Sequence, residues 1–223
     1  MAAENVTIGA IIAGTLRNVV GNLPAVALYL AVFATGGSAG QYLGGLGTGE
    51  YEIAGIAVEL AFTLGALVGG YLLLEAMLKR AGLLHHYGPR RFFAYVGQGI
   101  LIGLGILLGM MLLIVPGVIL GVRWAIASPL LVGSGAGAVD GIKASWEMTR
   151  GHGVKIFVAC LPLGLVLLLV LGMSVGWAGD NGLAVIVAQN VAAELLTVLV
   201  TALSATLFGM LAPGGAELRE VFA

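Results

Sequence analysis

The stretch VPGVILGVRWAIASPLLVGSGAGAVDGIKASWEMTRG, residues 115–151, decides how the rest of the chain is read. It opens at Pro116-Gly117, which predicts a tight turn, and continues as an apolar run that contains Arg123. A glycine-serine joint at 133–137 follows, and the stretch ends in a short segment whose charges recur at helical spacing. Arg123 is the only one of the ten Lys and Arg residues that falls inside an apolar run. Because a guanidinium is costly inside a membrane unless it is paired, we expect Arg123 to have a specific partner.

The composition of the chain is that of a helical membrane protein. Of its 223 residues 60% are apolar and 9% are charged, and the mean hydropathy is +1.07. Soluble domains carry about 25% charged residues, far more than this chain does. Several apolar runs reach the roughly 20 residues that a helix needs to cross a bilayer, and alternating strand patterns are absent. The net charge of −1 offers no overall attraction for nucleic acid.

The predicted fold class is an all-α polytopic membrane protein, one domain over residues 1–223. We expect six spans, at about 23–35, 53–78, 92–113, 118–132, 156–177 and 183–210. Two interfacial amphipathic helices are predicted at 5–21 and 138–150; the alternative for 5–21 is an extension of the first span. The glycine-rich residues 36–52 are expected to form an outer loop, and Ser128-Pro129 is expected to kink the fourth span.

The segment at 138–150 predicts a helix that lies on the membrane surface. Val139, Ile142 and Trp146 share one face, and Trp146 is of the type that anchors at the headgroup level. The charged residues follow another face at helix-neighbour spacing: Asp140, Lys143, Glu147 and Arg150. Gly151 is expected to end the helix.

The distribution of basic residues predicts the orientation. With six spans and a cytoplasmic N-terminus, all basic residues outside the spans fall on the cytoplasmic side, and none falls in the three outer connections. They are Arg17, Lys79, Arg80, Arg90, Arg91, Lys143, Arg150, Lys155 and Arg219. By the positive-inside rule we expect a multi-pass protein of the bacterial-type inner membrane, with both termini cytoplasmic. No cleavable signal peptide is expected, because no basic region precedes a short apolar one at the N-terminus.

Three polar residues are predicted to share one layer of the membrane with Arg123. Arg123 and Glu59 each lie six residues past the outer end of their spans, roughly 9 Å deep. Gln189 and Asn190 enter the sixth span to a similar depth. We therefore expect a buried Glu59–Arg123 pair, with Asn190 or Gln189 satisfying the remaining donors. Glu194 must then share Arg123, be protonated or face water.

A polar stripe runs along the sixth span, consisting of Asn190, Glu194, Thr197, Thr201 and Ser204 at alternating spacings of four and three. Two interpretations are open. The stripe and the buried pair can serve only to hold the helices together, without a further function. Alternatively, it lines a polar groove that binds a lipid headgroup or a small solute.

Part of the chain resembles a known family. The resemblance rests on four segments: Val115-Pro116-Gly117-Val118-Ile119-Leu120, Val122-Arg123-Trp124, Ala127 to Val132, and Gly141 to Gly151. They are similar to the six-span membrane-domain family of glycerophosphodiester phosphodiesterases and to YciC-like bacterial inner-membrane proteins, which also begin with an amphipathic helix. The resemblance implies the fold and the location, without a phosphodiesterase domain and without a transferable activity.

The function that the sequence favours is that of a non-enzymatic inner-membrane protein. It would organise or bind lipids or amphiphilic or protein partners. Membrane lipids are the expected partners, a second copy or another membrane protein is left open, and no nucleic acid is expected. The alternative is a small transporter or channel with a polar path through Glu59, Arg123 and Glu194. An enzyme is the least favoured class, because no nucleophile–base pair or metal-ligand cluster is evident. No cofactor is expected.

Overall fold

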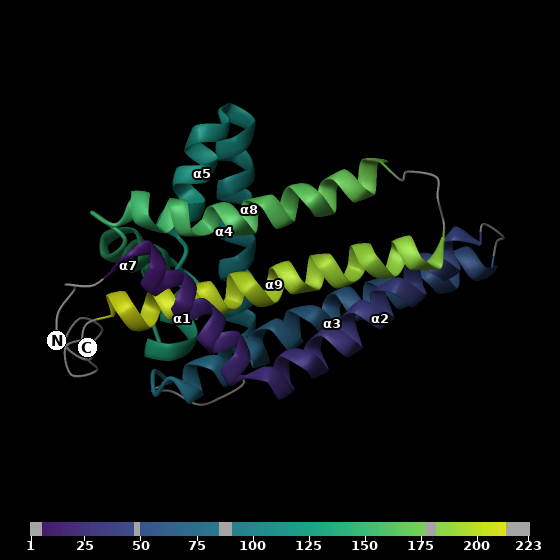
Figure 1. Cartoon of the computed structure of the whole chain (residues 1–223), viewed down its shortest axis with the longest axis horizontal. Coiled ribbons are helices and arrows are strands. Elements are labelled where there is room, and N and C mark those ends of the chain that lie inside the picture. The colour runs from purple at the N-terminus through teal and green to yellow at the C-terminus, as the bar shows by residue number, and fades with distance from the viewer. Residues whose placement is uncertain (1–5, 47–49, 85–90, 177–181, 213–223) are drawn as a thin grey trace. The chain divides into compact units, whose positions relative to one another are not determined.

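The computed structural model describes residues 6–46, 50–84, 91–176 and 182–212, and all regular structure in these residues is helical (Figure 1). The helices, in chain order, are α1 (Ile8–Gly21), α2 (Leu23–Gly45), α3 (Glu50–Arg80), α4 (Phe92–Leu112), α5 (Ile114–Arg123), α6 (Ala127–Pro129), the π-helical segment η2 (Leu130–Ser134), α7 (Ala138–Met148), α8 (Gly153–Gly176) and α9 (Leu183–Leu211). The predicted all-α class is confirmed.

Among the described residues, five stretches are long and apolar enough to cross a membrane: α2, α3, α4, α9 and the interrupted run Ile114–Ser134. A sixth candidate is the pair α7 and α8, which is bent by 108° at the break between the two helices. The chain is therefore a polytopic membrane protein with five to six spans, in agreement with the predicted architecture. The sharp bend also separates α7 from the span that follows it.

The predicted end of the first span at residue 35 is wrong, because α2 continues to Gly45. The reason is a row of glycines four residues apart that packs against α3. A Cβ atom on Gly40 would lie 2.7 Å from the backbone nitrogen of Glu59, and one on Gly55 would lie 2.2 Å from the nitrogen of Gly44. These contacts leave no room for side chains, so the glycine-rich residues that predicted a loop extend a close-packed helix.

The fourth span also differs from its predicted form. The turn before it lies at Leu113, whose backbone is extended, and Pro116 and Gly117 belong to the first turns of α5. Proline is tolerated there because its missing N–H would have no intrahelical acceptor. The span is interrupted between α5 and α6, a few residues before Pro129, which removes a helical hydrogen bond and crowds the preceding turn. The predicted kink near Ser128-Pro129 is thus present as a break.

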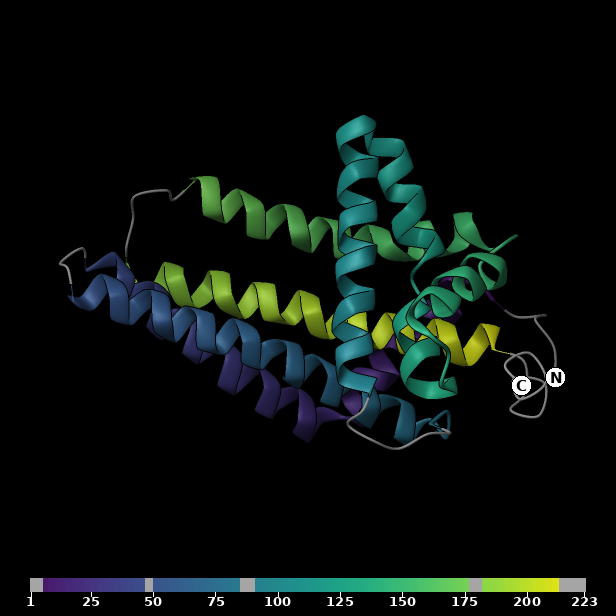
Figure 2. The ribbon, with the colours of Figure 1, turned by 180° about the vertical axis from the view of Figure 1, so that it is seen from behind.

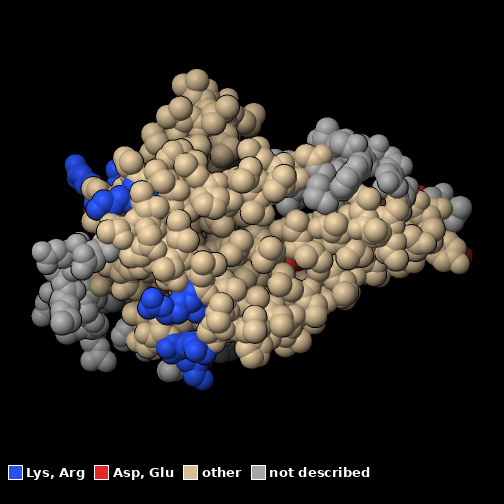
Figure 3. All heavy atoms as spheres, viewed as in Figure 1, with Lys and Arg blue, Asp and Glu red and all other residues tan. Residues whose placement is uncertain are grey.

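The chain divides into two compact units. One, which we call the basic unit, comprises Met1–Gly21, Leu74–Cys160 and Thr201–Ala223. The other, the cation-free unit, comprises Asn22–Leu73 and Leu161–Val200. All ten Lys and Arg residues of the sequence fall in the ranges of the basic unit, to which the blue side chains of Figure 3 belong.

The basic unit has a densely packed interior. The largest fully buried side chains of the described chain all belong to it, among them Phe208, Met77, Leu131 and Ile156. It also contains the hairpin of α4 and α5, whose helices run side by side in Figure 2. The two helices meet closely, since a Cβ on Gly109 would lie 2.9 Å from the Cα of Gly117.

The tip of this hairpin is a continuous run of exposed apolar residues. Met111, Leu112 and Ile114 are 76%, 78% and 74% exposed. Along α4, Gly105 and Gly109 face α5, whereas a Cβ on Gly99 or Gly103 would meet nothing within 4 Å. Within the described chain, Gly105 and Gly109 are therefore used for packing, and Gly99 and Gly103 are not.

Candidate functional site

Arg123 lies at the end of α5, where the fourth span breaks. Its carbonyl oxygen accepts a hydrogen bond from the Oγ of Ser145 at 2.8 Å. Oγ1 of Thr149, directly after α7, lies 3.2 Å from the same oxygen and 2.8 Å from the carbonyl oxygen of Ser145, to which its single proton can donate instead. The backbone N–H of Ile126, on the other side of the break, donates to Ser145 Oγ at 3.3 Å. Since unpaired backbone groups are costly in an apolar interior, the Ser145 hydroxyl of α7 stabilises the break.

The guanidinium of Arg123 lies over the indole ring of Trp146. Its Cζ is 5.3 Å from the ring centroid, within the range of a cation–π interaction. Its Nη1 is buried and has no hydrogen-bond partner among the described residues. Within the described part of the basic unit, Arg123 forms no ion pair with a carboxylate. The charge is thus held against an aromatic face and keeps an unused donor.

The helix α7 presents two distinct faces. Gly141, Ser145 and Thr149 are buried, and a Cβ on Gly141 would lie 2.8 Å from the Nε2 of Gln98. The residues predicted for the interfacial face are exposed: Asp140, Lys143, Trp146, Glu147 and Arg150. Gly151 follows with a positive φ of 86°, which suits its predicted role at the end of the helix.

Two long polar side chains brace the joint between η2 and α7. Nη1 of Arg91 donates to the carbonyl oxygen of Leu131 at 3.0 Å, and Nε2 of Gln98 donates to that of Ala138 at 3.0 Å. Gly135 lies between these acceptors with a φ of 88°, a conformation that glycine adopts without strain. Neither brace was predicted, because Arg91 was assigned to a solvated loop and Gln98 to the interior of a span.

Glu59 is not buried, contrary to the prediction. It is an exposed residue of α3, and it belongs to the cation-free unit, whereas Arg123 belongs to the basic unit. The predicted Glu59–Arg123 pair therefore stays a prediction. Asn190, predicted to satisfy Arg123, donates through Nδ2 to the Oε1 of Gln41 at 3.0 Å and to the carbonyl oxygen of Ile186 at 2.9 Å.

Glu194 is joined to α2. The hydroxyl of Tyr29 donates to its Oε2 at 2.8 Å, and Tyr29 is only 5% exposed. Together with the Gln41–Asn190 bond, this contact forms a polar seam between α2 and α9 within the cation-free unit. The spacing of the polar residues predicted the α9 side of the seam. It did not predict the α2 side, where the contacts are made by the hydroxyl of Tyr29 and the amide of Gln41.

The remainder of the predicted polar stripe is divided along α9. Oγ1 of Thr197 donates to the carbonyl oxygen of Ala193 at 3.3 Å, and Oγ of Ser204 donates to that of Thr201 at 2.9 Å. Such bonds to the preceding helical turn satisfy a hydroxyl inside its own helix. Thr201 and Ser204 belong to the basic unit, and Thr197 and the half-buried Gln189 to the cation-free unit.

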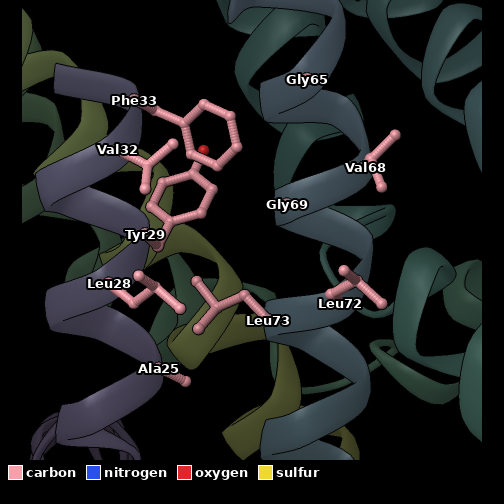
Figure 4. A pocket seen from close by; sticks show the side chains of 10 residues that line it. All are labelled: Ala25, Leu28, Tyr29, Val32, Phe33, Gly65, Val68, Gly69, Leu72 and Leu73. Carbon is pink, nitrogen blue, oxygen red and sulfur yellow. The ribbon is translucent and has the colours of Figure 1, made fainter. Parts of the chain in front are cut away.

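The cation-free unit contains an apolar groove of about 520 Å³ between α2 and α3 (Figure 4). The rings of Tyr29 and Phe33 lie on one side of it, 4.8 Å apart, opposite Gly65 and Gly69. Its remaining lining residues are Ala25, Leu28, Val32, Val68, Leu72 and Leu73. The sequence did not predict this groove, to which Gly65 and Gly69 contribute backbone without side chains.

Within the described residues, no group of three or more His, Cys, Asp or Glu residues is placed to hold a metal ion. His85, His86 and Arg90 lie outside the described residues. No family model, curated protein or solved structure matches the chain. The family resemblance of residues 115–151 therefore stays a prediction.

Proposed function

We propose that this integral membrane protein binds the anionic headgroups of membrane lipids or other amphiphiles at the membrane surface, without catalysing a reaction. The observation that carries the proposal is Arg123: its guanidinium rests on Trp146 and keeps a buried Nη1 without a partner among the described residues. A phosphate or carboxylate oxygen is the acceptor that such a donor prefers. Trp146 is 40% exposed, so the cation–π pair lies at the edge of the protein rather than in its centre.

The helix α1 supports an interfacial role for the basic unit. One face packs on α9, where Ile11 is fully buried and Nδ2 of Asn18 donates to the Oγ1 of Thr206 at 2.7 Å. Another face presents apolar residues one helical turn apart that are 37–69% exposed: Ile8, Ile12, Leu16 and Val20. A helix held to the protein on one face and apolar on its exposed face suits the headgroup region.

The lipids retained by the purified protein test the proposal. Native mass spectrometry in mild detergent would count bound phosphatidylglycerol and phosphatidylethanolamine on the wild type, on Arg123→Gln and on the control Arg17→Gln, which removes an exposed cation from α1. A lost charged hydrogen bond of about 1.5–3 kcal/mol predicts a loss of roughly tenfold or more in bound anionic lipid for Arg123→Gln. Folded Arg123→Gln protein that retains as much phosphatidylglycerol as Arg17→Gln would contradict the proposal.

A transporter or channel is the second candidate, and the carboxylates of the cation-free unit favour it. Glu194 is half-buried and Glu59 exposed, and both lie within helices long enough to span a membrane. Carboxylates at such positions often mark proton or ion paths. Proteoliposomes loaded with a pH-sensitive dye should show proton flux that Glu194→Gln abolishes; equal flux in vesicles without protein would exclude a proton path.

We also propose that the basic unit holds the cytoplasmic ends of the spans. The support is that every Lys and Arg of the sequence falls in its ranges. In a Cys160→Ser background, single cysteines in place of Lys143 and Glu50 can be labelled with an impermeant maleimide. Lys143→Cys should react only after the inner membrane is opened, and Glu50→Cys should react in intact spheroplasts. The reverse pattern would invert the orientation.

A further inference from the structure

We infer that the groove between α2 and α3 seats one acyl chain of a membrane lipid. The first support is its chemistry. Every lining side chain is a hydrocarbon except Tyr29, whose hydroxyl is directed to Glu194 by the 2.8 Å hydrogen bond. The groove therefore offers apolar surface and no free headgroup-binding cation, since its unit has no Lys or Arg.

The second support is the medium in which the groove opens. Both of its walls, α2 and α3, are long and apolar enough to cross a membrane. The residues at its rim are exposed: Leu28 by 66%, Val32 by 39%, Val68 by 43% and Leu72 by 56%. In a spanning helix, such residues meet lipid tails rather than water. The opening of the groove therefore faces the acyl chains of membrane lipids.

The third support is the size of the groove. At the roughly 30 Å³ that a water-sized group occupies, its volume of about 520 Å³ has room for about 17 methylene-sized groups, enough for a segment of an acyl chain. The lining residues of α3 run from Gly65 to Leu73, about 12 Å at 1.5 Å per residue. A helix about 10 Å across would occupy about 900 Å³ over that length, nearly twice the groove. The volume favours a chain over a second helix.

The glycines of α3 explain why the groove exists. A Cβ on Gly69 would lie 2.3 Å from Cε2 of Phe33 and 3.0 Å from Cε2 of Tyr29. The two rings therefore sink against the bare backbone of α3, as Figure 4 shows, and the space beside them is left open between the flanking leucines and valines. The same small residues that allow close helix contact thus shape the groove.

Photolabelling tests this inference. The full chain would be reconstituted in vesicles of equal parts phosphatidylethanolamine and phosphatidylglycerol with a trace of phosphatidylethanolamine carrying a diazirine midway along one acyl chain. Mass spectrometry of the peptides should find labels concentrated on residues 25–33 and 65–73. The internal comparison is Ile56, Leu60 and Leu64, residues of α3 outside the groove that are 55–58% exposed. Equal labelling of both sets would overturn the inference.

A matched pair of variants sharpens the test. Ala25→Phe fills one end of the groove, whereas Ala27→Phe adds the same ring to an exposed position two residues along α2 that does not line the groove. Groove labelling should fall several-fold in Ala25→Phe and stay at the wild-type level in Ala27→Phe. A photo-reactive side chain in place of Leu72 that links two protein copies instead of lipid would assign the groove to a dimer. Because Arg123 takes no part, loss of headgroup selectivity in Arg123→Gln with intact groove labelling separates the two sites.

Discussion

In the basic unit, Phe208, Met77 and Leu131 fill a side-chain interior, whereas in the cation-free unit Gly40 and Gly55 bring helix backbones into direct contact. The first arrangement resembles the packing of a soluble domain, where buried volume supplies the stability. The second is the packing of transmembrane helices, where small residues allow close approach because lipid is as apolar as leucine. The position of the cations follows the same division, since all of them belong to the unit with the side-chain interior.

This difference predicts which kind of substitution destabilises each unit most. In the basic unit, polar side chains satisfy interrupted backbone, as Ser145 and Arg91 do. In the cation-free unit, the polar contacts between helices run between side chains, as between Tyr29 and Glu194. Substitutions that add volume should therefore be most damaging at the α2–α3 backbone contact of the cation-free unit, and substitutions that remove a hydrogen bond should be most damaging at the break after α5 in the basic unit.

The largest effect is expected from Gly55→Ala. Its Cβ would lie 2.2 Å from a backbone nitrogen of α2, which cannot move without separating the helices. We expect the free energy of unfolding in mixed detergent micelles to fall by about 3 kcal/mol. Gly164→Ala is the control, since its Cβ meets nothing within 4 Å and alanine favours the helix by about 0.5–1 kcal/mol. Equal stabilities would show that the backbone contact does not hold the unit together.

A smaller loss is expected from Ser145→Ala in the basic unit. It leaves the Ile126 N–H without its acceptor and removes one donor from the Arg123 carbonyl, at a cost of about 2 kcal/mol. Ser38→Ala is the control, because Oγ of Ser38 donates only to the carbonyl of Ala34 in the preceding turn of its own helix. The same unfolding measurement compares them; a Ser38→Ala loss as large as that of Ser145→Ala would refute the role of α7 at the break.

Tyr29→Phe is expected to cost about 1 kcal/mol, the size of a hydrogen bond between membrane helices. Glu194→Gln should cost less, because the amide oxygen still accepts from the tyrosine hydroxyl. Tyr42→Phe, at an exposed position of the same helix, serves as the control. If Glu194→Gln is the more damaging change in thermal unfolding, the charge rather than the hydrogen bond holds the seam.

Lys143→Gln should have the smallest effect, within about 0.5 kcal/mol, because the side chain is exposed on α7. The retained anionic lipid, measured beside Arg123→Gln, should fall only slightly, since a solvated cation contributes mainly through screened, long-range attraction. An Lys143→Gln loss that equals the Arg123→Gln loss would move the headgroup site from the cation–π pair to the charged face.

The sequence predicted helix type and position well where hydrophobicity alone decides, as in α4 and α9, whose bounds lie within one residue of the predicted 92–113 and 183–210. It failed at residues 36–45, because glycine signals a turn in water and a contact surface in lipid, and only the neighbouring helix distinguishes the two.

The candidate site was predicted less well than the fold. The sequence singled out Arg123 and Glu194 as residues that need partners, but depth along a span says nothing about the direction of a side chain. The structure places Arg123 against Trp146 and Glu194 against Tyr29. The sequence predicted Trp146 to be an anchor at the membrane surface and placed Tyr29 within an apolar span. Gly141, Ser145 and Thr149 recur every four residues, a spacing that indicates a buried helix face. The prediction followed the periodicity of the charged residues instead and missed this face.

The hydrogen bonds from Ser145 to the break after α5 have a consequence for the order in which the helices insert into the membrane. The carbonyl of Arg123 and the N–H of Ile126 leave the ribosome about twenty residues before the hydroxyl that pairs with them. Until α7 has been made, the fourth span carries open backbone groups, which membrane interiors reject. We therefore expect this span to complete its insertion only after α7 has been made, together with that helix.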